Sequence, residues 1–168
     1  KAPDPFVPDL PNVVPASSLV APARTHFHNA TPKETGSALR WEDYEIGERI
    51  DHIDGITVEE PEHMMATRLY HNTARVHFNQ FAEAQGRFGK RIVYGGHVIS
   101  IARALSYNGL SNALCIAAIN GGRHVNPVFA GDTIFAWSEV LDKAAIPNAD
   151  EPTANRHDCA ALRLRLRS

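Results

Sequence analysis

The segment "LYHNTARVHFNQ", residues 69–80, gathers side chains that can do chemistry: two histidines, two asparagines, an arginine and a threonine. Imidazole exchanges protons near neutral pH, and guanidinium binds a carboxylate through two parallel hydrogen bonds. A surface loop would normally be rich in Gly, Pro or Ser, and a solvated helix face in Glu and Lys. The composition of the segment therefore predicts the lining of a site.

A helix before this segment must position its first residues. Pro61 follows Glu59 and Glu60, and both features favour a helix N-terminus, so a helix is expected from there to about Tyr70. Its apolar stripe is expected to face the core and consists of Met64, Met65 and Leu69.

A second helix is predicted over "GGHVISIARAL", residues 95–105. One buried face follows from the i, i+3, i+4, i+7 spacing of Val98, Ile101, Ala102 and Leu105. Gly95 and Gly96 open this helix, where free N–H groups and the absence of a Cβ allow close approach of an oxyanion. A simple turn before a helix is the alternative interpretation.

Strands are expected around these helices. The segment 44–60 reads as an edge strand with a bend at Gly55, and segments 112–128, 132–145 and 160–168 read as three more. The "FAGD" turn predicts that segments 112–128 and 132–145 form an antiparallel hairpin. In the last strand, three leucines alternate with Arg163, Arg165 and Arg167, which we interpret as solvated. The predicted class is α+β, with an antiparallel sheet wrapped around a long central helix.

Composition limits the function classes. The chain has 168 residues, 43% of them hydrophobic, which suits one domain with a sizeable core. A formal charge of -2 and a pI near 6.5 argue against nucleic acid or an anionic membrane surface as a partner. The apolar runs are shorter than the roughly 20 residues of a membrane span. Cys115 and Cys159 lack CxxC spacing, which suits a reducing cytoplasm.

Residues 1–40 differ from the remainder because prolines crowd them, so we expect a Pro-rich linker or extension that runs as extended chain. Residues 41–168 are expected to form the folded domain. We count about four strands in it, so a final strand is expected to be missing or to lie in another segment, which leaves an edge to be covered.

The order of "WEDYEIGERI", the polar run with its histidine, "RIVYGGHVIS" and "NPVFAGDTI" resembles the MaoC-like hydratases, which have the hotdog fold. The resemblance covers roughly residues 41–145 and is strongest to the branch that hydrates short branched enoyl-CoA thioesters such as mesaconyl-CoA. Members of that branch carry two hotdog halves in one chain, and this sequence resembles the second half with its preceding linker. The resemblance thus implies an acyl-CoA substrate and a second hotdog unit, from the same polypeptide or a homodimer mate. It implies no cofactor, since coenzyme A belongs to the substrate.

The resemblance also implies catalytic roles. The family pairs an aspartate with a histidine five residues later, and these positions fall on Asn72 and His77. Asn72 can orient a water but cannot carry a proton, so His77 is expected to be the base. Gly96 occupies the position of the family's oxyanion donor, whose loss typically costs roughly 3 to 4 kcal/mol.

Further residues are expected to bind the substrate. Arg75 could pair with the free carboxylate of mesaconyl-CoA, or with an acidic residue across a domain contact. The complete set of expected substrate-binding residues is Arg75, Asn79, Tyr94, Gly95, His97 and Arg123. Arg123, with His124 beside it, could instead anchor a CoA phosphate. Arg87, Lys90 and Arg91 could meet CoA too, although surface charge clusters are usually solvated.

Other readings remain open at the level of sequence. The nine histidines show no spacing that indicates a metal site, and we interpret His52, His63 and His157 as surface or supporting residues. A hotdog thioesterase is an alternative in which His77 activates water against the thioester carbonyl. A non-catalytic half that supports a partner's active site is another, favoured by the missing aspartate.

Overall fold

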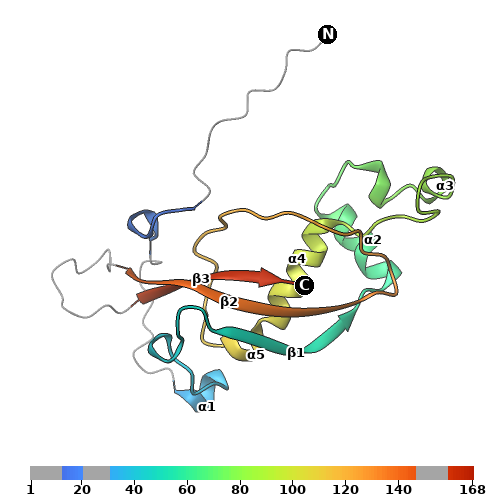
Figure 1. Ribbon diagram of the computed structural model, residues 1–168. Helices are drawn as coiled ribbons and strands as arrows, with labels where there is room; N and C mark the ends of the chain where they lie inside the picture. The colour runs from blue at the N-terminus through green and yellow to red at the C-terminus, as the bar shows by residue number, and fades with distance from the viewer. Residues whose placement is uncertain (1–12, 21–30, 147–158) are drawn as a thin grey trace, which may run out of the picture.

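Strand β2, Thr133–Ile146, forms the centre of an antiparallel sheet in the computed structural model, which describes residues 13–20, 31–146 and 159–168. On one side it pairs with β1, Arg49–Thr57, and on the other with β3, Cys159–Arg167, so the order is β1-β2-β3 (Figure 1). Alternate residues Ile134, Ala136, Ser138 and Val140 are buried, which is the period-two pattern of a strand with one covered face.

Helix α4, Gly95–Leu105, covers that face of the sheet, behind the strands in Figure 1. The four residues predicted to form its buried stripe, Val98, Ile101, Ala102 and Leu105, are each no more than 8% exposed. They form the main core cluster with β2, Val58 and Val93. A long helix against an antiparallel sheet confirms the predicted α+β class.

The shorter elements connect this framework. Helix α2 spans Glu60–Leu69, and the following chain forms a 3-10 turn, η3, at Arg75–His77 and a single helical turn, α3, at Gln80–Glu83. The remaining elements are η1 Ala16–Ser18, α1 Pro32–Thr35, η2 Trp41–Asp43 and α5 Tyr107–Leu110. No helix in the described residues is long and apolar enough to cross a membrane.

Segment 112–128 is not a strand, so the predicted hairpin with 132–145 is wrong. A strand needs a neighbour that takes up its backbone hydrogen bonds, and both ladder sides of β2 are already occupied by β1 and β3. The segment therefore arcs over the sheet as irregular chain with Leu114, Ile116 and Ile119 exposed (Figure 1). The "FAGD" turn itself is present: Asp132 N–H donates to Phe129 O at 3.1 Å, and Gly131 has φ 94°.

Helix α2 buries a face that the sequence did not indicate. Its buried residues are His63, Ala66 and Thr67, whereas Met65 and Leu69 are 62% and 68% exposed. The prediction that the methionine stripe faces the core is therefore wrong for the described chain. The buried face is polar because Thr67 Oγ1 donates to the His63 carbonyl at 2.8 Å and the His63 ring bonds Glu60.

Two smaller expectations also change. The bend predicted at Gly55 begins earlier, where β1 shifts register between Asp51 and Gly55 and Ile53 has φ 62°. In the described part of residues 1–40, the predicted extended chain is interrupted by η1 and α1. A capping box of Thr31 and Glu34 stabilises the single turn of α1.

Of the surface and supporting roles expected for His52, the structure shows a supporting one, because the side chain is fully buried. Its Nδ1 lies 2.6 Å from Asn108 O and its Nε2 lies 2.8 Å from Ser138 Oγ, so it fastens the turn of α5 to the sheet. In that turn Gly109 has φ 101°, a left-handed conformation, and Tyr44 donates to its carbonyl. His157 lies outside the described residues.

The third strand has one ladder neighbour, β2, among the described residues. Its arginines lie on the wetter face, but two of them are not simply solvated: Arg165 Nη1 lies 2.8 Å from Glu139 Oε2, and Arg163 Nη2 lies 3.6 Å from Asp142 Oδ2. That a further strand covers this edge stays a prediction.

Candidate active site

His77 lies at the end of η3 with one ring nitrogen in use. Its Nδ1 is 2.9 Å from the main-chain carbonyl of Ile92. A carbonyl only accepts, so Nδ1 must carry the proton in this contact, and Nε2 of the neutral ring is left with a free lone pair. The imidazole is therefore set up as a proton acceptor at Nε2.

The ring of Tyr94 connects His77 to the start of α4. Its centroid lies 5.8 Å from that of His77, with an interplanar angle of 62°, an edge-to-face arrangement. A Cβ added at Gly96 would lie only 2.5 Å from Cζ and Oη of Tyr94, so the aromatic ring packs directly on this glycine. His77, Tyr94 and Gly96 are thus brought together from η3 and the N-terminus of α4.

The first turn of α4 offers free donors. His97 N–H donates back to Tyr94 O at 2.9 Å, whereas the N–H groups of Gly95 and Gly96 have no hydrogen-bond partner among the described residues. Such orphan donors, together with the partial positive charge of a helix N-terminus, stabilise negative oxygen. This geometry is consistent with the oxyanion role expected for Gly96.

Asn72 follows the C-terminus of α2, and its side chain has a structural partner. Its Oδ1 accepts the N–H of Ala74 at 2.8 Å, which leaves the amide NH₂ as the group available to a water. Asn72 lines a pocket of about 330 Å³ with Thr67, Arg68, His71 and Phe78. No direct hydrogen bond joins it to His77 within the described chain, and His77 is not among the residues that line this pocket.

Arg75 and Asn79 lie on either side of His77. The Arg75 side chain is 71% exposed and its Nε is 4.0 Å from Glu83 Oε1, a loose contact that leaves the guanidinium available to a ligand. Asn79 caps α3, since its Oδ1 accepts the N–H of Ala82 at 3.0 Å. Its polarity therefore has a local structural cause, and only its NH₂ remains for substrate.

The other expected substrate-binding residues lie around the start of α4. The His97 ring is 12% exposed, with Nε2 at 3.2 Å from Glu62 Oε1. A Cβ added at Gly95 would overlap the ring of His124, so the irregular segment places this histidine over the helix N-terminus. Arg123, beside it, is exposed. The described residues contain no group of three His, Cys, Asp or Glu side chains arranged to hold a metal.

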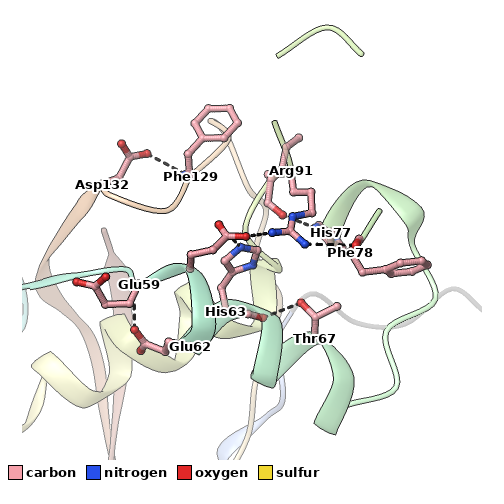
Figure 2. A network of polar contacts seen from close by, with 11 residues as sticks. Glu59, Glu62, His63, Thr67, His77, Phe78, Arg91, Phe129 and Asp132 are labelled. Atoms are coloured by element: carbon pink, nitrogen blue, oxygen red, sulfur yellow. Dashed lines mark hydrogen bonds and ion pairs between the residues drawn. The ribbon is translucent and has the colours of Figure 1, made fainter. Parts of the chain in front are cut away.

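A polar cluster of Glu60, His63 and Arg91 was missed by sequence reasoning; His63 and Arg91 are largely buried in it, whereas the Glu60 side chain is 51% exposed. The Glu60 carboxylate contacts both His63 Nε2, at 3.2 Å, and the guanidinium of Arg91. Figure 2 shows the side chains of His63 and Arg91 near each other. His63 is 0% exposed, and its Nδ1 has no hydrogen-bond partner among the described residues. Burial, and next the proximity of His77, lowers the pKa of His63, against a smaller opposite effect of Glu62.

The signal for part of this cluster was present in the sequence. Glu60 and His63 are three residues apart on α2, so they share a helix face, yet Glu60 was assigned only to the helix N-terminus. Arg91 was grouped with a surface cluster, although its side chain is only 16% exposed. Its contact with Glu60 joins residues far apart in the chain, and no local pattern predicts it.

Comparison with known proteins adds independent information. Residues 42–158 match the family model described as "MaoC like domain". The chain is 60% identical over 164 residues to a beta-methylmalyl-CoA dehydratase of Chloroflexus aurantiacus, and 54% identical over 165 residues to a mesaconyl-CoA hydratase of Cereibacter sphaeroides. Each match covers 98% of this chain and 45% of the relative, so the chain spans about half the length of these relatives.

Solved structures agree with the sequence matches. A MaoC domain protein dehydratase from Chloroflexus aurantiacus superposes with a TM-score of 0.87 at 60% identity, over 99% of this chain and 45% of that one. A MaoC-like dehydratase from Rhodospirillum rubrum superposes with a TM-score of 0.56 at 23% identity, over 77% of this chain and 84% of that one, and supports the fold alone.

Proposed function

The chain belongs to the MaoC-like domain family and has its hotdog fold, and from that premise we propose that it supplies the active site of a hydro-lyase. The proposed reaction is the reversible addition of water across the C2=C3 bond of a short branched enoyl-CoA, in particular mesaconyl-CoA to β-methylmalyl-CoA. The names of the two relatives, at 60% and 54% identity, support this substrate. The observation that carries the proposal is the bare Nε2 of His77 beside an aromatic ring that packs on Gly96.

The chemistry follows from this arrangement. Water attacks C3 and gives a proton to His77 Nε2, while the electron pair of the double bond moves toward C2 and the thioester oxygen. The Gly96 N–H donates to that oxygen as it becomes negative. The imidazolium then returns its proton to C2, which restores the neutral ring and the thioester, so protons and electrons balance within one turnover. Asn72 would hold the water through its free NH₂.

The free carboxylate of mesaconyl-CoA requires a cationic partner, since an unpaired charge is costly to desolvate. Arg75 is the proposed partner, because its guanidinium is exposed and only loosely held by Glu83. The proposed role of Asn79, Tyr94, Gly95, His97 and Arg123 is to shape and line the acyl-CoA site.

We further propose that a second hotdog unit packs on this one, from the same polypeptide or a second copy. Support comes from the apolar side of α2, where Met65 and Leu69 are exposed beside a pocket of about 390 Å³. The relatives are more than twice as long as the matched segment, so the rest of their chain is long enough to form such a unit.

A cytoplasmic location is proposed on the free, exposed thiol of Cys115, which suits a reducing compartment.

The test is an assay of the complete native polypeptide with mesaconyl-CoA. A hydratase removes the absorbance of the conjugated thioester without release of free thiol. Release of free thiol would indicate a thioesterase instead, and the absence of both changes would indicate a non-catalytic half. Crotonyl-CoA, which lacks the free carboxylate and the methyl branch of mesaconyl-CoA, serves as the comparison substrate for the contribution of Arg75.

A further inference from the structure

Residues 76–78, which include His77, are tied to residues 91–92 by three hydrogen bonds. Ile92 N–H donates to Val76 O at 3.2 Å, His77 Nδ1 donates to Ile92 O at 2.9 Å, and Arg91 Nη1 donates to Phe78 O at 3.4 Å. His77 is therefore fixed by a hydrogen bond of its own ring and by hydrogen bonds to the main-chain carbonyls of its two neighbours, Val76 and Phe78.

The guanidinium of Arg91 is itself anchored on α2. Its Nη2 contacts Glu60 Oε1, while the other carboxylate oxygen lies 3.2 Å from Nε2 of the fully buried His63 (Figure 2). Through two nitrogens of its planar guanidinium, Arg91 thus joins Glu60 on α2 to the main-chain carbonyl of Phe78, the residue after His77. Lysine has a single ammonium and cannot reproduce this fork geometry.

We propose that Glu60 and Arg91 are positioning residues that hold His77 in the orientation required for proton transfer, a role that rests on the proposed function. Arg91 is poorly placed for coenzyme A because its side chain is only 16% exposed and already engaged at two nitrogens. Effective proton transfer requires the base within hydrogen-bond reach of the reacting water, so small displacements of the imidazole are costly.

The test uses Arg91→Lys, Arg91→Gln and Glu60→Gln in the complete native polypeptide, with kcat and KM for mesaconyl-CoA. Because the segment that carries His77 loses its contact with Arg91 or Glu60, each variant is expected to lower kcat roughly 10- to 100-fold while KM changes less than about threefold. Arg91→Lys should retain more activity than Arg91→Gln. The matched control is Arg165→Lys, which alters an Arg–Glu pair of the sheet and should leave both constants unchanged.

A second readout does not depend on activity. Nitrogen-15 spectra of the histidine rings distinguish a protonated from a bare nitrogen, and His77→Gln identifies the signals of His77. Wild-type protein should show His77 protonated at Nδ1 only, and Arg91→Lys should show a mixture of tautomers. A single unchanged tautomer in the variants, or unchanged kcat in folded variants, would overturn the positioning role. If wild-type protein hydrates nothing, the proposed function fails, and the spectra alone still decide this inference.

Discussion

His77 and Ile92, fifteen residues apart, are joined by a hydrogen bond of 2.9 Å from the imidazole Nδ1 to the main-chain carbonyl. The bond fixes which ring nitrogen is basic, since the protonated Nδ1 leaves Nε2 as the acceptor. The orientation of the His77 ring therefore depends on the backbone at Ile92.

Gly96→Ala is expected to lower kcat by roughly 10²- to 10³-fold, because the new Cβ would displace Tyr94 and disturb the oxyanion donor. Measurement of kcat with mesaconyl-CoA checks this. Gly122→Ala is the matched control, since a Cβ there meets no atom within 4 Å. Equal losses in the two variants would contradict the specific role of Gly96.

Asn72→Ala is expected to cost less activity than loss of His77, because Asn72 orients water but moves no proton. Asn72→Asp keeps the acceptor for the Ala74 N–H yet adds a negative charge beside a substrate that carries its own carboxylate. The rate with mesaconyl-CoA should fall more than the rate with crotonyl-CoA. An equal fall for both substrates would show that the added charge does not meet the substrate carboxylate.

The buried His63 predicts a dependence of stability on pH. Burial lowers its pKa below the unfolded value near 6.5, so the unfolded chain binds the proton at higher pH than the folded chain does. The free energy of unfolding should therefore decrease as the pH falls below about 6.5, by at most about 1.4 kcal/mol per pH unit for one proton. Urea titrations between about pH 7 and 5 should show a flatter dependence for His63→Gln. Identical slopes for variant and wild type would rule out this contribution.

Helix α4 and the position of its free N–H groups were predictable, because a heptad-like spacing of apolar residues and an initial Gly pair are local features. Segment 112–128 was not, since its apolar run is typical of a strand but strand formation depends on a neighbour elsewhere in the fold. The same limit applies to the site. The polar run predicted the lining of a site, and the family resemblance assigned His77 the role of base. The contacts that link residues 76–78 to Arg91 and Glu60 arise only in the folded chain.

The exposed stripe on α2 predicts an interface. Met65→Glu in the complete polypeptide is expected to lower the free energy of unfolding by roughly 1 to 3 kcal/mol, because the second hotdog unit would bury the new carboxylate. Ile46→Glu, at a side chain 63% exposed, is the control and should change stability by less than about 0.5 kcal/mol. Urea unfolding measures both, and equally small effects would place the stripe in solvent.

The central claim is that His77 transfers the proton, and the most direct test is kcat of His77→Ala in the complete polypeptide with mesaconyl-CoA. The account predicts a fall of roughly 10²- to 10⁴-fold, the usual contribution of a general base, with the thermal unfolding midpoint close to that of wild type. Equal rates for His77→Ala and wild type would contradict it and would place the base at another residue.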